Sequence, residues 1–191
     1  MRIILASGSP RRKELMEQLG FEFEIVKSNA SEFVGSFDGP EDLVKQLAKK
    51  KALEVCERYP KDMVLGFDTL VFLNDKVYGK PQNEEECIQM IKELRDNTHL
   101  VVTGGYIKAP GYEDSFSTEC KVHFKHISDE DIIEYAKTDE PYDKAGAYAI
   151  QGFIGRFIDS VDGDFFTVIG LPKAEVYKKI TNYMRNIEKW Y

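Results

Sequence analysis

The sequence lacks a long hydrophobic run near its start, where one arginine and the apolar residues 3–5 precede Ser7. Such a run is too short for a signal peptide or a membrane span. The chain also lacks an internal repeat, a linker and a low-complexity segment. We therefore expect a cytoplasmic protein that does not enter a membrane.

Cysteine is scarce, and the cysteines that are present show no CxxC spacing. Each of them stands beside apolar neighbours in a periodic segment: Cys56, Cys87 and Cys120. This distribution favours reduced thiols in a protein core.

Positive charge is outweighed, with 26 lysines and arginines against 33 acidic residues and a net charge of −7. The overall field repels nucleic acid polymers, so a site for a polyanion would have to be a local basic patch. This balance favours a small phosphorylated ligand as the partner. The length of 191 residues suffices for a single domain over 1–191, or for two lobes around a cleft.

An unusual helix start follows the first expected strand. Ser9 is placed as the N-cap and Pro10 as the first residue of a helix that ends at Gly20. Three cations crowd the first turn, where the helix dipole favours acidic residues: Arg11, Arg12 and Lys13. The arrangement fits a phosphate or carboxylate held by free backbone N–H groups, hydroxyls and guanidinium groups. The alternative is a solvated basic face.

Apolar periodicity alternates strands with helices along the rest of the chain. Strands are expected over 21–25, 63–65 continued by 70–73, 77–78, 100–107 and 116–124, with one ending near 161 and another at 169. Helices are expected from Pro40 to Cys56, after the caps Asn83 and Ser128, and along the last stripe of Val176, Ile180, Tyr183 and Ile187. The strand over 116–124 alternates apolar and polar residues and should have one wet side.

Two charged residues lie where apolar residues are expected. Asp68 interrupts an apolar strand, and its burial is costly unless it is paired, hydrogen-bonded or bound to a metal. Its alternative role is to cap the adjacent turn over 66–69. Lys51 stands on the apolar stripe of a helix, so it either snorkels from the edge of the core or points into a cleft.

The segment over 140–152 is rich in small residues and has no clear period, which indicates close packing. Gln151 lies there between Ile150 and Gly152, and a buried amide in such surroundings needs a partner. The edge of a ligand is one candidate for that partner. A tight structural loop is the other interpretation, and it explains Gly146 and Gly152.

Six motifs occur in order along the chain: ASGSPRRKEL, GFDTLV, GKP, THLVVTG, EPYDKAGAYAIQG and GDFFTVIGLP. Together they resemble the Maf family of nucleoside triphosphate pyrophosphatases over nearly the whole chain. The DKAGAYAIQG form resembles the members that act on dTTP and UTP, whereas the branch that acts on 7-methyl-GTP carries an acidic residue in place of Gln151. The resemblance implies an α/β fold of the Maf and ITPase type, with a mixed twisted sheet, flanking helices and two lobes around a central cleft, often as a homodimer.

The resemblance also implies hydrolysis of the α–β phosphoanhydride of dTTP or UTP with Mg²⁺ or Mn²⁺, giving the monophosphate and pyrophosphate. Modified pyrimidine triphosphates would fit the same pocket. In this interpretation Asp68 is the base that activates water and, together with Glu32, a metal ligand. The phosphate-binding residues are Ser7, Arg12, Lys51, Lys80 and Lys144. For Lys144, a structural ion pair with Asp143 is an equally good explanation.

By similarity to the family's specificity positions, the choice of nucleotide is assigned to Arg11, Thr69 and Gln151. A glutamine amide offers a donor and an acceptor, which match the O4 and N3–H groups of uracil or thymine. The chain departs from the family pattern at two places. Asn29 and Ser31 stand where further acid is common near Glu32, and Phe67 replaces a small residue.

Two other functions fit the same residues. A nucleotidyltransferase also uses a glycine and serine turn followed by arginine, and it would pass the nucleotidyl group to an acceptor. A nucleotide-sensing regulator of cell division would bind the triphosphate without turnover. Asp68, Glu32 and the set of cations favour catalysis over binding alone.

Overall fold

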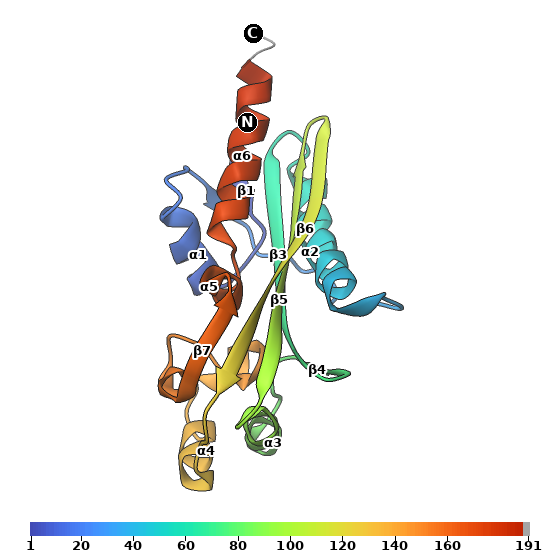
Figure 1. The fold of residues 1–191 in the computed structure, drawn as a ribbon. Coiled ribbons are helices and arrows are strands. Elements are labelled where there is room, and N and C mark those ends of the chain that lie inside the picture. Colours follow the sequence, from blue (N-terminus) through green and yellow to red (C-terminus); the bar gives the residue numbers. More distant parts are fainter. Residues whose placement is uncertain (189–191) are drawn as a thin grey trace. The chain divides into compact units, whose positions relative to one another are not determined.

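The computed structural model describes residues 1–188, which form two compact units (Figure 1). The first unit comprises residues 1–68 and 103–118 and the chain from Gly170 onward. The second unit comprises residues 69–102 and 119–169. The chain passes from one unit to the other inside three strands, and once more between Ile169 and Gly170.

The strands form one mixed sheet of seven in the order β2-β1-β3-β5-β6-β7, with β4 paired to β3. Their bounds are β1 Ile3–Leu5, β2 Glu24–Ile25, β3 Met63–Leu73, β4 Lys76–Tyr78, β5 Thr98–Ala109, β6 Tyr112–Phe124 and β7 Ile158–Gly163. β1 runs parallel to β2 and β3, whereas the pairs β3–β4 and β6–β7 are antiparallel. The helices are α1 Pro10–Glu17, α2 Gly39–Arg58, α3 Glu84–Leu94, α4 Asp129–Ala136, α5 Phe165–Ile169 and α6 Lys173–Glu188. The predicted mixed sheet with flanking helices is confirmed.

In the first unit, α2 lies unusually close to the sheet because two strands present glycine to it. A Cβ atom on Gly66 of β3 would come within 2.4 Å of the carbonyl oxygen of Ala48. A Cβ atom on Gly104 of β5 would come equally close, 2.4 Å, to the backbone carbonyl of Val44. The predicted break in the strand over 66–69 is therefore wrong: β3 is continuous, and Gly66 serves helix packing rather than a turn.

The hairpin of β5 and β6 carries α2 on one face and α6 on the other (Figure 1). The hydroxyl of Ser117 donates to Glu41 of α2 at 3.1 Å, whereas Asp114 accepts a hydrogen bond from Lys179 of α6 at 2.6 Å. Residues an odd number apart on a strand point to opposite faces, so this contact pattern follows from the pleat. The predicted stripe of α6 is buried at Val176, Ile180 and Tyr183, and the side chain of Ile187 lies outside the described residues.

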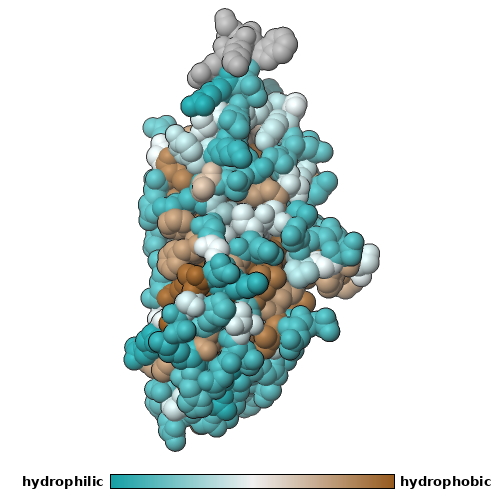
Figure 2. Space-filling view, in the orientation of Figure 1, coloured by the Kyte–Doolittle hydropathy of each residue, from teal (hydrophilic) through white to brown (hydrophobic). Residues whose placement is uncertain are grey.

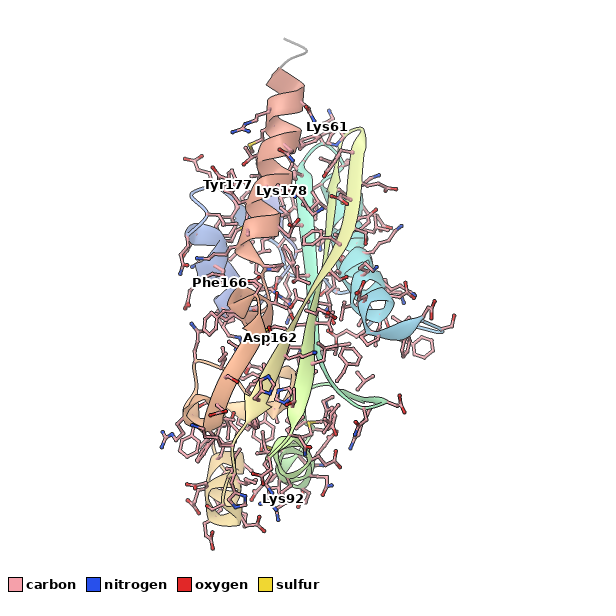
Figure 3. All side chains as sticks on the ribbon, in the orientation of Figure 1. Lys61, Lys92, Asp162, Phe166, Tyr177 and Lys178 are labelled. Carbon is pink, nitrogen blue, oxygen red and sulfur yellow. The ribbon has the colours of Figure 1, made fainter. Side chains whose placement is uncertain are left out.

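The second unit has a core of its own between α3, α4 and the ends of β5 and β6. The predicted caps are confirmed: Asn83 accepts from the N–H of Glu86 at 2.8 Å, and Ser128 accepts from that of Asp131 at 3.0 Å. Lys92 of α3, labelled in Figure 3, pairs with Asp129 of α4 at 2.8 Å. The following residues are core members of this unit: Cys87, Ile91, Leu94, Ile127 and Ile132.

The cysteines are free thiols, and Cys87 and Cys120 are buried, as predicted. Burial raises the pKa of Cys87 to about 11. The alternation predicted for 116–124 is confirmed as well, since Phe116, Cys120, Val122 and Phe124 are buried while Glu119 and Lys121 are exposed.

Two predicted strands differ from the structure. The segment leading to Ile169 is the helix α5, because the carboxylate of Asp164 caps it by accepting from the N–H of Phe166 at 3.1 Å and from the hydroxyl of Thr167 at 3.1 Å. The strand expected over 21–25 shrinks to β2, whose two residues are exposed at the edge of the sheet. Within the described residues its pairing partner is β1, itself three residues long, which limits its extent.

The surface seen in Figure 2 is mostly hydrophilic, with hydrophobic residues gathered in smaller areas. Within residues 1–188, none of the helices has the length and apolar character that crossing a membrane requires. Among the exposed large hydrophobic side chains are Phe33 and Phe37, in the loop that also carries Glu32.

Candidate functional site

The centre of the candidate site is an ammonium group that lies between two carboxylates in the first unit. Lys51, midway along α2, donates to Asp68 of β3, and its Nζ atom lies 2.9 Å from Oε1 of Glu32. Only 16% of the Lys51 side chain and 9% of the Asp68 side chain are exposed, against 59% for Glu32. The ammonium of Lys51 is thus mostly buried against carboxylates rather than snorkelling to solvent, and its pointing into a cleft stays a prediction. Asp68 lies inside a strand, so the turn-capping role is excluded.

The close packing of α2 on the sheet explains this geometry. Gly66 stands two residues before Asp68, on the same face of β3, and Lys51 follows the contact residue Ala48 by three positions, on the same side of α2. A larger residue at position 66 would lift the helix, and with it the ammonium of Lys51. The glycine thus sets the distance between the two charges.

The second cation of the site is Arg12, in the first turn of α1. Ser9 caps this helix by accepting from the N–H of Arg12 at 3.4 Å, as predicted. One guanidinium nitrogen, Nε, donates to the carbonyl oxygen of Gly170 at 2.8 Å, and another reaches the hydroxyl of Ser7 at 3.5 Å. Burial lowers the pKa of Arg12; the nearby Asp68 carboxylate opposes this, and Arg11 adds to the lowering. Arg12 is thus a desolvated guanidinium within electrostatic range of Asp68, and the anion site expected there stays a prediction.

The carbonyl of Gly170 is held in place by the start of α6. Tyr177 of α6, labelled in Figure 3, packs its ring 5.6 Å from the ring of Phe21, just beyond α1. Lys173 donates to the side chain of Gln18 at 2.9 Å. Sequence reasoning missed this role of Gly170. The need for glycine at its positive φ angle of 108° is the local feature that accompanies this role, and no pattern of side chains in the sequence indicates it.

Arg11 lies beside Arg12 in the first turn of α1, whereas the remaining predicted site residues, Thr69, Lys80, Lys144 and Gln151, lie in the second unit. The N–H of Gly146 donates to the carbonyl of Gly79 at 3.0 Å, which ties the segment around Lys144 to the turn that carries Lys80. Lys144 pairs with Asp143 at 2.5 Å, so its structural ion pair is present. Lys80 is exposed and Thr69 is half-buried.

Gln151 is exposed, in a turn between two 3-10 helices, Ala145–Ala147 and Phe153–Phe157. The expectation of a buried amide that needs a partner is therefore wrong. Within the described part of the chain, its amide makes no hydrogen bond, which leaves the donor and the acceptor open to a ligand.

The family model described as Maf-like protein matches residues 2–183 of this sequence. The chain belongs to the Maf family.

Relatives with the same printed name support this assignment. A Geobacillus sp. (strain WCH70) protein named dTTP/UTP pyrophosphatase is 41% identical over 179 residues, which cover 94% of this chain and 96% of the relative. A Bacillus cereus protein of that name is 41% identical over 182 residues, covering 95% of each chain. One from Caldicellulosiruptor bescii is 45% identical over 178 residues, covering 90% of this chain and 89% of its own.

Among solved structures, the Staphylococcus aureus Ham1 protein matches with a TM-score of 0.52 at 13% identity, covering 83% of this chain and 80% of its own. At this identity the likeness shows the fold alone.

The residue at which the chain departs from the Maf pattern, Phe67, is part of the core in this structure. Its ring is fully buried and meets that of Phe116 edge-on, with centroids 6.4 Å apart.

The described residues of this Maf protein contain no group of three or more histidine, cysteine or acidic side chains that could hold a metal ion. Glu32 and Asp68, which both contact Lys51, are the carboxylates of the candidate site that could serve as metal ligands. Mg²⁺ is commonly bound by one or two carboxylates together with substrate phosphates and water. This donor pair fits such a cation when a triphosphate supplies the other oxygens.

Proposed function

We propose that this Maf protein hydrolyses dTTP and UTP to the nucleoside monophosphate and pyrophosphate. The names of the relatives over nearly the full chain support the reaction and its substrates. The observation that carries the proposal is the contact of Lys51 with both Asp68 and Glu32, close to the guanidinium of Arg12. This cluster combines a buried carboxylate with the cations that a triphosphate requires.

The role of Asp68 follows from what hydrolysis needs. A water oxygen forms a bond to the α-phosphorus while the bond from that phosphorus to the bridging oxygen of pyrophosphate breaks. A carboxylate within hydrogen-bond reach takes the proton from the attacking water. Asp68 lies inside β3, and the hydrogen bond from Lys51 fixes the direction of its carboxylate for this task.

The cations balance the charge of the phosphates. Lys51 has three N–H groups, and two of them face Asp68 and Glu32, which leaves one for a phosphate oxygen. Arg12 is positioned by Gly170 and Ser7, so its guanidinium is pre-organised for an anion. Phosphate contacts from Ser7, Lys80 and Lys144 are part of the proposal on the strength of the family motifs.

A divalent cation, Mg²⁺ or Mn²⁺, would be held by Glu32 and Asp68. When bound, it supplies Lewis-acid stabilisation of charge on the phosphate oxygens. The choice of base is assigned to Arg11, Thr69 and Gln151, and modified pyrimidine triphosphates share the uracil-type edge that a glutamine amide matches. We further propose cytoplasmic action on free nucleotides, without a nucleic acid polymer as partner, and assembly as a homodimer.

Pyrophosphate release is the test, measured with Mg²⁺ and then Mn²⁺ on dTTP, UTP, CTP, dATP, GTP and 7-methyl-GTP without any acceptor. We expect selective cleavage of dTTP and UTP, which Asp68→Asn abolishes while nucleotide binding persists. Asp114→Asn is the matched control, because Asp114 is also a strand aspartate paired with a helix lysine of the same unit, at 2.6 Å.

The outcomes separate the competing functions. Full activity of Asp68→Asn would remove Asp68 as the base. Pyrophosphate formed only in the presence of an acceptor would identify a nucleotidyltransferase. Tight binding of dTTP without any turnover would identify a nucleotide sensor.

A further inference from the structure

The turn that carries Gln151 is held from one side by a carboxylate of the same unit. Glu140 lies at the start of the 140–152 segment, and its carboxylate accepts from the backbone N–H of Phe153 through both oxygens, at 3.1 Å and 3.3 Å. This N–H belongs to the second residue after Gln151. A single side chain therefore fixes the peptide at the end of the turn.

Gly152 brings the carboxylate against the turn. A Cβ atom at this position would lie 1.8 Å from Oε1 of Glu140, so the observed contact requires glycine. The turn itself is closed by a hydrogen bond from the N–H of Gly152 to the carbonyl of Ala149 at 3.0 Å. The backbone on the C-terminal side of the exposed Gln151 is thus fixed at two successive N–H groups, those of Gly152 and Phe153.

Glu140 is itself held at both its side chain and its backbone. The hydroxyl of the buried Tyr135 donates to Oε1 of Glu140 at 3.3 Å and to the carbonyl of Ala147 at 3.0 Å. The ammonium of Lys144 donates to the backbone carbonyl of Glu140. The ring of Tyr135 also stacks on that of Phe153, with centroids 5.5 Å apart. Through these contacts, Tyr135 links the helix α4 to Glu140 and to the end of the turn.

We propose that Glu140 is a positioning residue for base selection, acting through Gln151. This inference rests on the proposed role of Gln151. A glutamine amide matches the uracil edge in one orientation and the cytosine edge in the opposite one. The turn sets the position and direction from which this side chain reaches the base, so a displaced turn weakens the match to uracil. Glu140 never contacts the nucleotide in this scheme. It fixes the turn from which the amide extends.

Three variants test the clamp, with the ratio of kcat/KM for UTP to that for CTP as the readout. Glu140→Ala removes the clamp, and we expect the ratio to fall by about tenfold, mainly through KM and through gained CTP cleavage. Glu140→Gln keeps the Oε1 acceptor for Phe153 and Tyr135, so the ratio should stay within about threefold of the wild type. Gly152→Ala leaves Glu140 in place but pushes its carboxylate away, and it should reduce the ratio as Glu140→Ala does.

The double variant Glu140→Ala with Gly152→Ala adds a test of mechanism. Because the clash disappears with the carboxylate, its ratio should be no lower than that of Glu140→Ala alone. Glu134→Ala is the matched control: this glutamate lies on α4, pairs with Lys137 at 2.7 Å, has 72% of its side chain exposed and does not contact the turn.

Gln151→Ala, measured in parallel, separates the two levels of the argument. If it keeps the wild-type selectivity, the role of Gln151 is wrong and the inference is overturned with it. If it loses selectivity while folded Glu140→Ala keeps it, the role of Gln151 stands and the clamp is overturned. Should Glu140→Ala not fold, unchanged selectivity of Gly152→Ala overturns the clamp, and lost selectivity that Glu140→Gln retains supports it.

Discussion

The guanidinium of Arg12 donates to the carbonyl oxygen of Gly170 at 2.8 Å, across 158 positions of the sequence. The first functional motif of the chain is therefore positioned by the last one. Gly170 adopts a φ angle of 108°, a conformation that side chains rarely tolerate. The orientation of the Arg12 guanidinium thus depends on backbone geometry at Gly170 as well as on the hydroxyl of Ser7.

Replacing Gly170 should uncouple these two motifs. We expect Gly170→Ala to destabilise the fold by about 2 kcal/mol, because alanine is strained at this φ angle. Its kcat/KM for dTTP should fall by roughly tenfold or more, since the cation that we propose to bind phosphate loses much of its effect when it is displaced by a fraction of an ångström. Thermal unfolding and pyrophosphate release measure the two effects.

Gly111→Ala is the control for this prediction. Gly111 also has a positive φ angle, 72°, and open space around it, so alanine there meets a similar strain far from Arg12. It should lose stability but keep its activity. Equal losses of activity in the two variants would show that strain alone, and not the contact with Arg12, accounts for the effect.

Lys51 stabilises the fold as well as the site. Lys51→Met leaves the buried carboxylate of Asp68 without its ammonium partner, and we expect the free energy of unfolding to fall by about 3 kcal/mol. Activity should be lost at the same time. The double variant Lys51→Met with Asp68→Asn removes both charges, so it should regain most of the stability and none of the activity. Denaturant unfolding that shows no such recovery would contradict the pairing.

The contact of α2 with the sheet should tolerate no side chain at Gly104. Because the new Cβ atom would lie 2.4 Å from backbone atoms of Val44, Gly104→Ala should cost about 3 kcal/mol of unfolding free energy. Gly35→Ala, with open space around its position, should be neutral. A Gly104→Ala protein as stable as the wild type would refute the close approach of the helix.

His99 should make the protein less stable in mild acid. Its ring is buried, its Nε2 atom lies 2.6 Å from the hydroxyl of Tyr148, and within the described residues its Nδ1 atom has no hydrogen-bond partner. Burial, with a smaller effect from His123, lowers the pKa of His99 to about 3. The unfolded chain therefore binds a proton below its ordinary pKa of about 6.5, whereas the folded chain does not.

The stability due to neutral His99 is thus complete above pH 6.5 and is lost as the pH falls toward 3. Between these values the free energy of unfolding should fall by up to about 1.4 kcal/mol per pH unit. His99→Gln should remove this slope, whereas His126→Gln, at a ring with 70% of its side chain exposed, should leave it. The measurement is the free energy of unfolding by denaturant at several pH values, compared between the wild type and the two variants.

Much of the fold was predictable because its signals are local. Three helix starts were predicted from N-cap residues, whose capping hydrogen bonds need no distant contact: Ser9, Asn83 and Ser128. Lys51 and Asp68 were found for a different reason. Each breaks an apolar pattern, and a buried charge needs a partner. The sequence could not show that they are each other's partner.

The predictions that were wrong concern segments whose structure depends on residues distant in sequence or on a local helix cap. Gly66 looked like a turn because its reason, the approach of α2, lies outside its own segment. The run before Ile169 has β-forming residues, yet Asp164 caps it as a helix. Gln151 has apolar sequence neighbours but is exposed, because a closed turn carries it outward. Arg11, Thr69 and Gln151 were assigned to base choice by similarity to the family rather than from a local pattern.

The three strands that pass through both units limit how this chain can be divided. The unit boundary falls inside β3 after Asp68, inside β5 after Val102 and inside β6 after Thr118. Because neither unit is one continuous stretch of the chain, no single cut separates the two units from each other. Neither unit can therefore be produced as one continuous fragment. Neither proteolysis at a single position nor a gene that encodes one uninterrupted stretch would yield a complete unit by itself.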